Sequence, residues 1–405
     1  MTQLLIRNVR PLGASPVDVR VHDGRIAEIG AALAAPAGAT VEDGEGALLL
    51  PGLVEGHTHL DKTMWGMDWY RNEVGTNLTD KIENERAFRH ASGHDAAAQS
   101  LVLAKAFLAL GTTRLRTHVD VDTQAGLRHL EGTLRTRETL REVQQIQVVA
   151  FPQSGLLGRA GTAELLDQSL ALGADVLGGL DPCAIDGDPV KSLDVLFGIA
   201  HKHQRPVDIH LHEPGALGVF STELVMERTR ALGMQGKVTM SHAYELGSVN
   251  EATSRRLIEE FAELDISMAT VAPSTSNHLS LVQLVDAGVR IGLGQDGQRD
   301  YWSPYGNADM LDRTWQLAFT NGFRRDDHIE MALAVATMGG ASIMSHTSPR
   351  LADVADRPGL AVGDRADLLL VDGETPTSAV MDRGTDRLVI HDGRVVADGL
   401  RVLAL

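Results

Sequence analysis

The chain has 405 residues, 43% of them hydrophobic and 22% charged, with a formal net charge of -17. This charge disfavours nucleic acid and anionic membranes as partners, because both require clustered Lys and Arg. The single cysteine, Cys183, excludes an intrachain disulfide. We find no leader-like N-terminus and no apolar run of membrane-spanning length, so we expect a cytoplasmic protein.

Short strand patterns occur at both ends of the chain. They cover 4–9, 17–21 and 26–29 at one end and 366–372, 387–391 and 394–397 at the other. Asp-Gly pairs at 23–24 and 392–393 supply the positive φ of hairpin turns. Neither group is large enough for a sheet with a buried face. We therefore expect residues 1–50 and 352–405 to build one small β-sandwich-like domain together.

Between these ends, residues 51–351 alternate strand-like runs with helical spacing. The strand candidates are 52–58, 112–119, 145–151, 175–180, 206–211, 237–242, 265–271 and 289–295. Helical spacing fills the gaps, as at 96–110, 126–143, 162–172, 190–203 and 222–232. Eight such alternations predict an α/β fold, a closed (β/α)8 TIM barrel. A doubly wound open sheet is less favoured, because the first strand lacks the glycine-rich phosphate loop that usually follows it.

Side chains with catalytic or metal-binding chemistry stand at the ends of these predicted strands. His57 and His59 end the first strand and face the same way, about 7 Å apart. Other strands end in His118 and Asp120, Gln153, His210 and Glu213, His242, and Gln295 and Asp296. An isolated His-x-His could simply be a surface turn, but strand ends in a barrel meet at one mouth. Imidazoles with a carboxylate suit zinc or ferrous iron, so we predict a metal centre there.

The same residues carry a resemblance to a known family. His57-Thr-His59, His210-Leu-His-Glu213, His242 and Asp296 resemble the pattern of the amidohydrolase superfamily. Within it, segments 116–122, 149–155, 208–213 and 241–243 are similar to the cytosine deaminase branch. The chain also resembles triazine hydrolases of the N-isopropylammelide amidohydrolase type. The resemblance covers essentially the whole chain.

The resemblance implies a role for each matching residue. His57, His59, His210 and Asp296 would bind one divalent metal ion, Zn2+ or Fe2+. Glu213 would carry protons, His242 would polarise the attacking water, Gln153 would hold an amide edge of the substrate, and Asp296 would pass the water's proton to the leaving amine. Binuclear members carry a carboxylated lysine on a middle strand, and no lysine ends the third or fourth strand here, so we predict a single metal.

Departures from the cytosine deaminase pattern concern the substrate. Gly297 stands where that branch has a second acidic residue, which makes cytosine itself less favoured. Lys62 and Trp302 could contact an oxidised or anionic ring, and His118 is either a substrate contact or a hydrogen-bonded histidine of the barrel mouth. We expect His212 to support the metal ligands. Histidines in polar or helical stretches, such as His129, are predicted at the surface.

Three functions remain open at this point. The first is hydrolytic deamination of an aminopyrimidine-like or aminotriazine-like heterocycle, releasing ammonia. The second keeps the same site but expels an N-alkylamine or opens a cyclic amide. The third is a catalytically silent barrel that binds a heterocycle. The resemblance also implies a homo-oligomer that acts on a small heterocyclic substrate.

Overall fold

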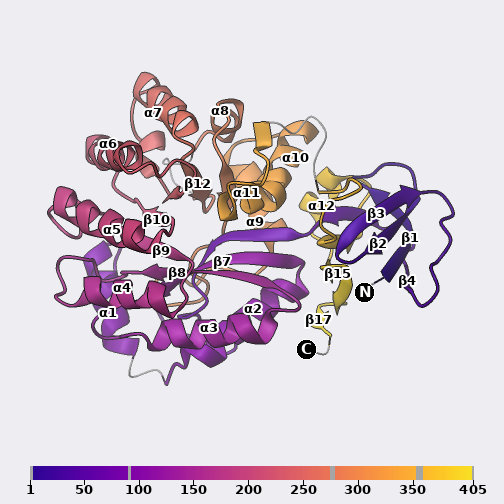
Figure 1. The fold of residues 1–405 in the computed structure, drawn as a ribbon, viewed down its shortest axis with the longest axis horizontal. Coiled ribbons are helices and arrows are strands. Elements are labelled where there is room, and N and C mark those ends of the chain that lie inside the picture. The colour runs from indigo at the N-terminus through magenta and orange to yellow at the C-terminus, as the bar shows by residue number, and fades with distance from the viewer. Residues whose placement is uncertain (1–2, 90–92, 274–278, 353–358, 404–405) are drawn as a thin grey trace.

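The computed structural model describes residues 3–89, 93–273, 279–352 and 359–403. These residues form a barrel of strands wrapped by helices and, beside it, a sheet built from both ends of the chain (Figure 1). The predicted fold class is therefore confirmed. In the described part of the chain, no helix is both long and apolar enough to cross a bilayer.

The barrel is a parallel sheet whose eight described strands follow one another in chain order. They are β6 (Leu53–Thr58), β7 (Thr112–Asp120), β8 (Gln145–Phe151), β9 (Val176–Leu180), β10 (Val207–His210), β11 (Val238–Ser241), β12 (Ser267–Thr270) and β13 (Ile291–Leu293). Each lies within one residue of a predicted run or inside it. Nearly all residues of these strands are buried, because helices cover the sheet from outside and side chains fill the barrel interior.

The barrel closes where β13 returns to β6. Thr58 and Asp296 form a parallel bridge, and the Asp296 N–H donates to the His57 carbonyl at 2.8 Å. The two strands approach so closely that a Cβ on Gly294 would lie 2.5 Å from the Cβ of His57. Glycine is required at this position because any side chain would push the strands apart.

Helices pack around the barrel as Figure 1 shows. They are α1 (Leu78–Arg89), α2 (Ala96–Ala109), α3 (Arg128–Leu140), α4 (Thr162–Leu172), α5 (Pro189–His203), α6 (Gly215–Ala231), α7 (Glu251–Glu263), α8 (Leu281–Asp286), α9 (Met310–Thr320), α10 (Asp326–Ala334) and α11 (Gly340–Met344). The predicted helices correspond to α2 through α6. Helix α1 was not predicted, and it supplies residues beside the cavity described below.

The terminal strands form a second sheet with the order β17-β16-β15-β14-β5-β1-β2-β3, and β4 pairs with β1. Their bounds are β1 (Gln3–Pro11), β2 (Val17–His22), β3 (Arg25–Gly30), β4 (Thr40–Asp43), β5 (Leu48–Pro51), β14 (Leu368–Val371), β15 (Arg387–His391), β16 (Arg394–Asp398) and β17 (Arg401–Val402), with α12 (Pro376–Asp382) between β14 and β15. The two ends of the chain meet where β5 pairs with β14. Residues from both ends, among them Ile6, Val19, Leu368 and Ile390, share one hydrophobic core.

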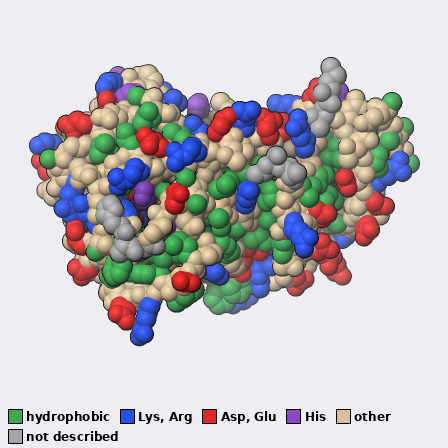
Figure 2. All heavy atoms as spheres, turned by 90° about the horizontal axis from the view of Figure 1, so that it is seen from below, with side chains coloured by type: hydrophobic (Ala, Val, Ile, Leu, Met, Phe, Trp, Pro, Cys, Tyr) green, Lys and Arg blue, Asp and Glu red, His purple; other side chains and the backbone are tan. Residues whose placement is uncertain are grey.

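A buried ion pair connects this sheet to the barrel. Arg387 on β15 is 1% exposed, and its guanidinium donates to both carboxylate oxygens of Asp309 at 2.8 Å. Asp309 also caps the N-terminus of α9, and Arg387 donates to the carbonyl of Leu110 after α2. On the face shown in Figure 2, by contrast, acidic and basic side chains are interspersed.

We predict that Arg387→Met destabilises the protein. The substitution leaves the Asp309 carboxylate buried without its cation, which costs about 3–5 kcal/mol. Chemical denaturation should show this loss in the free energy of unfolding. Arg394→Met is the matched control, because Arg394 is exposed and its Glu142 contact is 3.9 Å long, so a change of about 0.5 kcal/mol or less is expected. Equal effects of the two substitutions would contradict the prediction.

Candidate metal centre and active site

The four predicted ligands converge at the barrel mouth. Ligand atoms of His57, His59, His210 and Asp296 all lie within 4.8 Å of one another, although they come from the ends of β6, β10 and β13. His59 Nε2 is 3.2 Å from Asp296 Oδ1, and His57 Nε2 is 3.7 Å from the same oxygen. Three imidazoles and one carboxylate form a donor set that could hold a divalent metal such as zinc.

The orientation of the His57 ring supports this reading. Ser241 Oγ donates to Asp208 at 2.6 Å, so the same oxygen accepts a hydrogen bond from His57 Nδ1 at 2.9 Å. A proton on Nδ1 leaves a lone pair on Nε2, and Nε2 is buried with no hydrogen-bond partner among the described residues. Arg116 donates to Asp208 at 2.8 Å and keeps that carboxylate in place. An unpartnered imidazole nitrogen fixed by outer hydrogen bonds is typical of a metal ligand.

The protonation states of the other ligands fit the same role. Burial would raise the pKa of Asp296, but the adjacent imidazoles of His57 and His59 hold it well below its usual value. Burial, together with the charge of Lys62, lowers the pKa of His59 to about 4. Burial also lowers the pKa of His210, whose two ring nitrogens lack partners among the described residues. A carboxylate and neutral imidazoles are the forms that bind metals.

His242 and His118 pack against the ligand rings. The His242 ring lies 4.9 Å from the His57 ring and 5.0 Å from the His210 ring, between centroids. The His118 ring lies 4.1 Å from the His57 ring, and His118 is fully buried. His118 is not among the residues that line the cavity described in the next paragraph. The structure therefore does not place His118 where it was predicted to contact a substrate.

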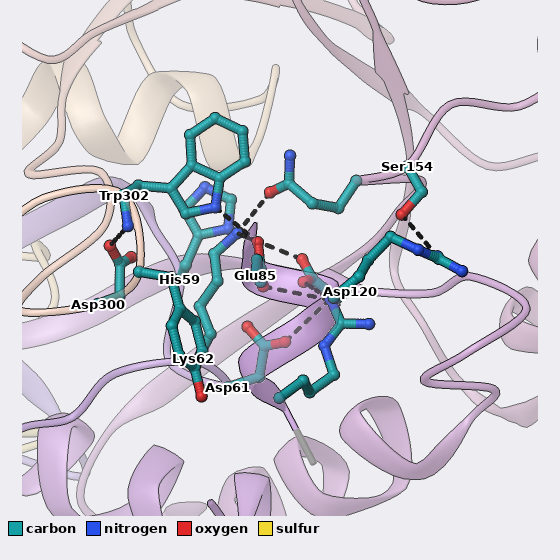
Figure 3. Close-up of polar contacts among 12 residues, drawn as sticks. His59, Asp61, Lys62, Glu85, Asp120, Ser154, Asp300 and Trp302 are labelled. Atoms are coloured by element: carbon teal, nitrogen blue, oxygen red, sulfur yellow. Dashed lines mark hydrogen bonds and ion pairs between the residues drawn. The ribbon is translucent and has the colours of Figure 1, made fainter. Parts of the chain in front are cut away.

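A cavity of about 990 Å³ opens from the ligand set, and we call it the mouth cavity. His59, His210 and Asp296 line it together with Lys62, Gln153 and Trp302, which were predicted as substrate contacts. Lys62 Nζ donates to Gln153 Oε1 at 2.5 Å and to Asp120 Oδ1 at 3.4 Å (Figure 3). Burial would lower the pKa of Lys62, but Asp120 and Glu85 raise it well above its usual value, so the ammonium stays charged.

The structure explains the glycine that departs from the cytosine deaminase pattern. A Cβ on Gly297 would lie 2.1 Å from Asp300 Oδ2, so the Asp300 carboxyl occupies the space of a side chain at 297. Asp300 is 2% exposed, and burial raises its pKa to about 7. Its Oδ1 accepts hydrogen bonds from the backbone of Trp302 and Ser303. No local sequence pattern indicates that the Asp300 carboxyl fills the space beside Gly297.

Glu213 lies apart from the mouth cavity. Its Oε1 accepts hydrogen bonds from the N–H groups of Cys183 and Ala184, at 2.8 and 2.7 Å, and its Oε2 accepts one from Ser221. His212 lines the cavity instead, with its ring centroid 4.2 Å from that of His242.

Asp181 holds His212 in this position, because it accepts hydrogen bonds from the His212 ring at 2.8 Å and from its backbone N–H at 2.6 Å. Sequence reasoning placed His212 only in a supporting role.

The prediction of a surface position was wrong for His129, which is 7% exposed and forms a hydrogen bond with Asp61 at 2.8 Å.

Comparison with known proteins places this geometry in context. The chain is 29% identical over 367 residues to an N-isopropylammelide isopropyl amidohydrolase of Pseudomonas sp. (strain ADP), covering 87% of each. It is 53% identical to the crystal structure of an N-isopropylammelide isopropylaminohydrolase from Burkholderia multivorans, covering 100% of both chains with a TM-score of 0.93. It is 26% identical to a 5-methylcytosine deaminase from Klebsiella pneumoniae, covering 97% of both with a TM-score of 0.82.

The fold and the site define a (β/α)8 barrel with a histidine and aspartate ligand set at its mouth. The chain belongs to the amidohydrolase family, whose model matches residues 40–397. This confirms the resemblance drawn from the sequence. Membership supports a hydrolase that acts on C–N bonds.

We predict that His210→Ala yields purified protein without stoichiometric metal, because one of the four ligands is gone. Ser241→Ala removes only the partner of His57 Nδ1 and should weaken metal affinity about 10- to 100-fold. Elemental analysis and chelator competition measure both effects. His203→Ala is the control, because His203 bonds Asp167 at the end of α5, away from the mouth. Full metal content in His210→Ala would refute the assigned site.

Proposed function

We propose that this protein hydrolyses the bond between an oxo-substituted nitrogen heterocycle and its exocyclic amine. It would use one divalent metal ion, Zn2+ or Fe2+, held by His57, His59, His210 and Asp296. One observation carries the proposal: this ligand set shares a cavity with the Lys62 and Gln153 pair. Similarity to two N-isopropylammelide enzymes favours an N-alkylamine as the leaving group. Similarity to a 5-methylcytosine deaminase supports ammonia as the second candidate.

The reaction needs a nucleophile stronger than neutral water. A bound divalent metal lowers the pKa of water from about 15.7 to about 7 and so supplies hydroxide at neutral pH. Asp296 is ionised and can accept the water's proton, then deliver it to the departing nitrogen. We assign the attacking water to His242, which packs against the His57 and His210 rings with both ring nitrogens unpartnered among the described residues, although His242, like His57, does not line the mouth cavity.

The Lys62 and Gln153 pair defines which ring edge fits. Because Lys62 donates to Gln153 Oε1, the amide presents its NH2 group as the free donor. Lys62 itself remains an ammonium and can only donate. Two donors call for acceptors on the substrate, such as ring carbonyls or a deprotonated ring nitrogen. This supports an oxo-triazine or oxo-pyrimidine over cytosine, in line with Gly297 in place of an acid.

We assign the protonation of the substrate to His212 and not to Glu213. His212 lines the cavity and is oriented by Asp181, whereas both Glu213 oxygens accept hydrogen bonds from the loop after β9 and from α6. A general acid must reach the atom that it protonates. Glu213 would then support the wall that carries Cys183 and Ala184.

The first prediction concerns the reaction itself. Metal-loaded protein should release isopropylamine from N-isopropylammelide and release ammonia more slowly from the corresponding unsubstituted amino compound, measured by mass spectrometry and an ammonia assay. Cytosine should be a poor substrate because it offers fewer oxo acceptors to Lys62 and Gln153. Lack of turnover across aminotriazines, aminopyrimidines and pterins, with metal confirmed, would refute the proposal. Ring binding without turnover would instead indicate the silent barrel.

The second prediction separates the two proton carriers. His212→Asn should lower kcat about 10²- to 10⁴-fold, the usual contribution of a general acid or base. Glu213→Gln should lower kcat much less, because its amide oxygen can still accept from the loop N–H groups. Both rates are compared at equal metal content. A large loss in Glu213→Gln with little change in His212→Asn would reverse the assignment.

A further inference from the structure

Helix α1 carries a buried carboxylate beside the mouth cavity. Glu85 is 1% exposed, and its Oε2 accepts a hydrogen bond from the indole N–H of Trp302 at 2.5 Å (Figure 3). The same oxygen lies 3.8 Å from Lys62 Nζ, and Oε1 lies 3.2 Å from Arg89. Glu85 does not line the cavity, so it does not contact the space where a substrate would bind.

Glu85 is ionised in this environment. Burial would raise the pKa of its carboxyl, but the charges of Lys62 and Arg89 outweigh burial and lower it. A buried carboxylate is costly unless cations and hydrogen bonds compensate it. Here Lys62, Arg89 and the Trp302 indole N–H compensate the Glu85 carboxylate, so all three groups must be correctly placed around it.

The two cavity residues that Glu85 contacts come from different segments. Lys62 follows β6, and Trp302 lies between β13 and α9. Backbone contacts fix the main chain of Trp302, whose N–H donates to Asp300 at 2.8 Å. The indole N–H itself donates to Glu85 on α1. The direction of the indole ring therefore depends on α1.

Lys62 is placed by the same carboxylate. Asp120 and Glu85 lie 3.4 and 3.8 Å from its ammonium, which also donates to Gln153. Arg89 in turn donates to Asp120 at 2.8 Å, so both carboxylates that face Lys62 are themselves held by α1. Lys62 Nζ also lies 5.5 Å from the centre of the Trp302 ring.

We propose that Glu85 is a positioning residue for substrate recognition, aligning the Lys62 ammonium and the Trp302 indole against the same bound ring. This inference rests on the proposed function, because it takes Lys62 and Trp302 as the contacts to an oxo-substituted heterocycle. Glu85 acts only through these two side chains. Its loss therefore weakens ring binding more than it slows the chemical step.

The test uses metal-loaded protein with N-isopropylammelide as the probe. Glu85→Gln should raise KM about 10- to 100-fold, the range for loss of hydrogen bonds to a charged group, with kcat nearly unchanged. Glu83→Gln is the matched control, because Glu83 is an exposed residue of the same helix and pairs with Arg159. Glu83→Gln should leave both constants unchanged.

Trp302→Phe provides a second variant that keeps Glu85 paired with Lys62 and Arg89. It removes the indole donor and part of the ring surface but leaves the Glu85 carboxylate in place, so it tests the contact even where Glu85→Gln folds poorly. In this background, Glu85→Gln should raise KM by a smaller factor than in the natural chain, since contacting residues are not additive. Additive effects, or a fall in kcat that tracks lost metal or lost folded protein, would overturn the proposal.

Tryptophan fluorescence distinguishes failure of this inference from failure of the proposed function. The chain has four Trp residues, and Glu85→Gln should change an emission component that is absent in Trp302→Phe. Binding of N-isopropylammelide to the metal-loaded protein, measured by calorimetry, should weaken in parallel. If the natural chain binds the ring but does not hydrolyse it, the proposed reaction is refuted. The effect of Glu85→Gln on ring affinity then still tests the positioning role of Glu85. Unchanged emission and affinity in Glu85→Gln would refute its positioning role.

Discussion

The site depends on the closure of the barrel between β6 and β13. The N–H of Asp296 donates to the carbonyl of His57 at 2.8 Å, which places ligands from the first and last barrel strands side by side. Glu55 supports the same junction, since its carboxylate accepts the backbone N–H groups of both His57 and Gln295. Asp296 has a φ of 64°, a left-handed conformation that is uncommon for residues other than glycine. Such strain persists only where surrounding contacts enforce it, and here it aims the carboxylate at the imidazoles.

Around this junction, buried charges determine what the mouth cavity can recognise. Burial lowers the pKa of His59 and of His210, while the adjacent imidazoles keep the pKa of Asp296 low, so Asp296 stays ionised. Lys62, which also lines the cavity, stays charged because carboxylates surround it. The cavity therefore combines metal-ligating residues with a Lys62 and Gln153 pair that offers hydrogen-bond donors. A ring that presents carbonyl oxygens to Lys62 and Gln153 would place its exocyclic nitrogen near the ligand set.

The loop after β13 shows where this chain departs from the cytosine deaminase pattern. Asp300 takes up the space that a side chain at 297 would need, and it also holds the backbone of Trp302. A larger residue at position 297 would therefore also displace the Asp300 carboxyl. The proposed ring contacts Lys62, Gln153 and Trp302 belong to loops, and α1 supports two of them through Glu85, whereas the metal ligands belong to the ends of strands.

The sequence alone determined the barrel, because eight apolar runs alternate with helical spacing and parallel strands end at one mouth. It also placed His57, His59, His210 and Asp296 together, since strand ends converge whatever the loops do. Tertiary structure decided the rest. Helix α1 buries Ile82, Glu85 and Arg89 on one face, so its buried side is mostly charged and gives no hydrophobic periodicity to recognise. The directions of His212 and Glu213 depend on Asp181 and on the loop after β9, which lie about thirty positions earlier in the chain. Such partners meet only after folding, because no local pattern encodes a hydrogen bond between distant loops.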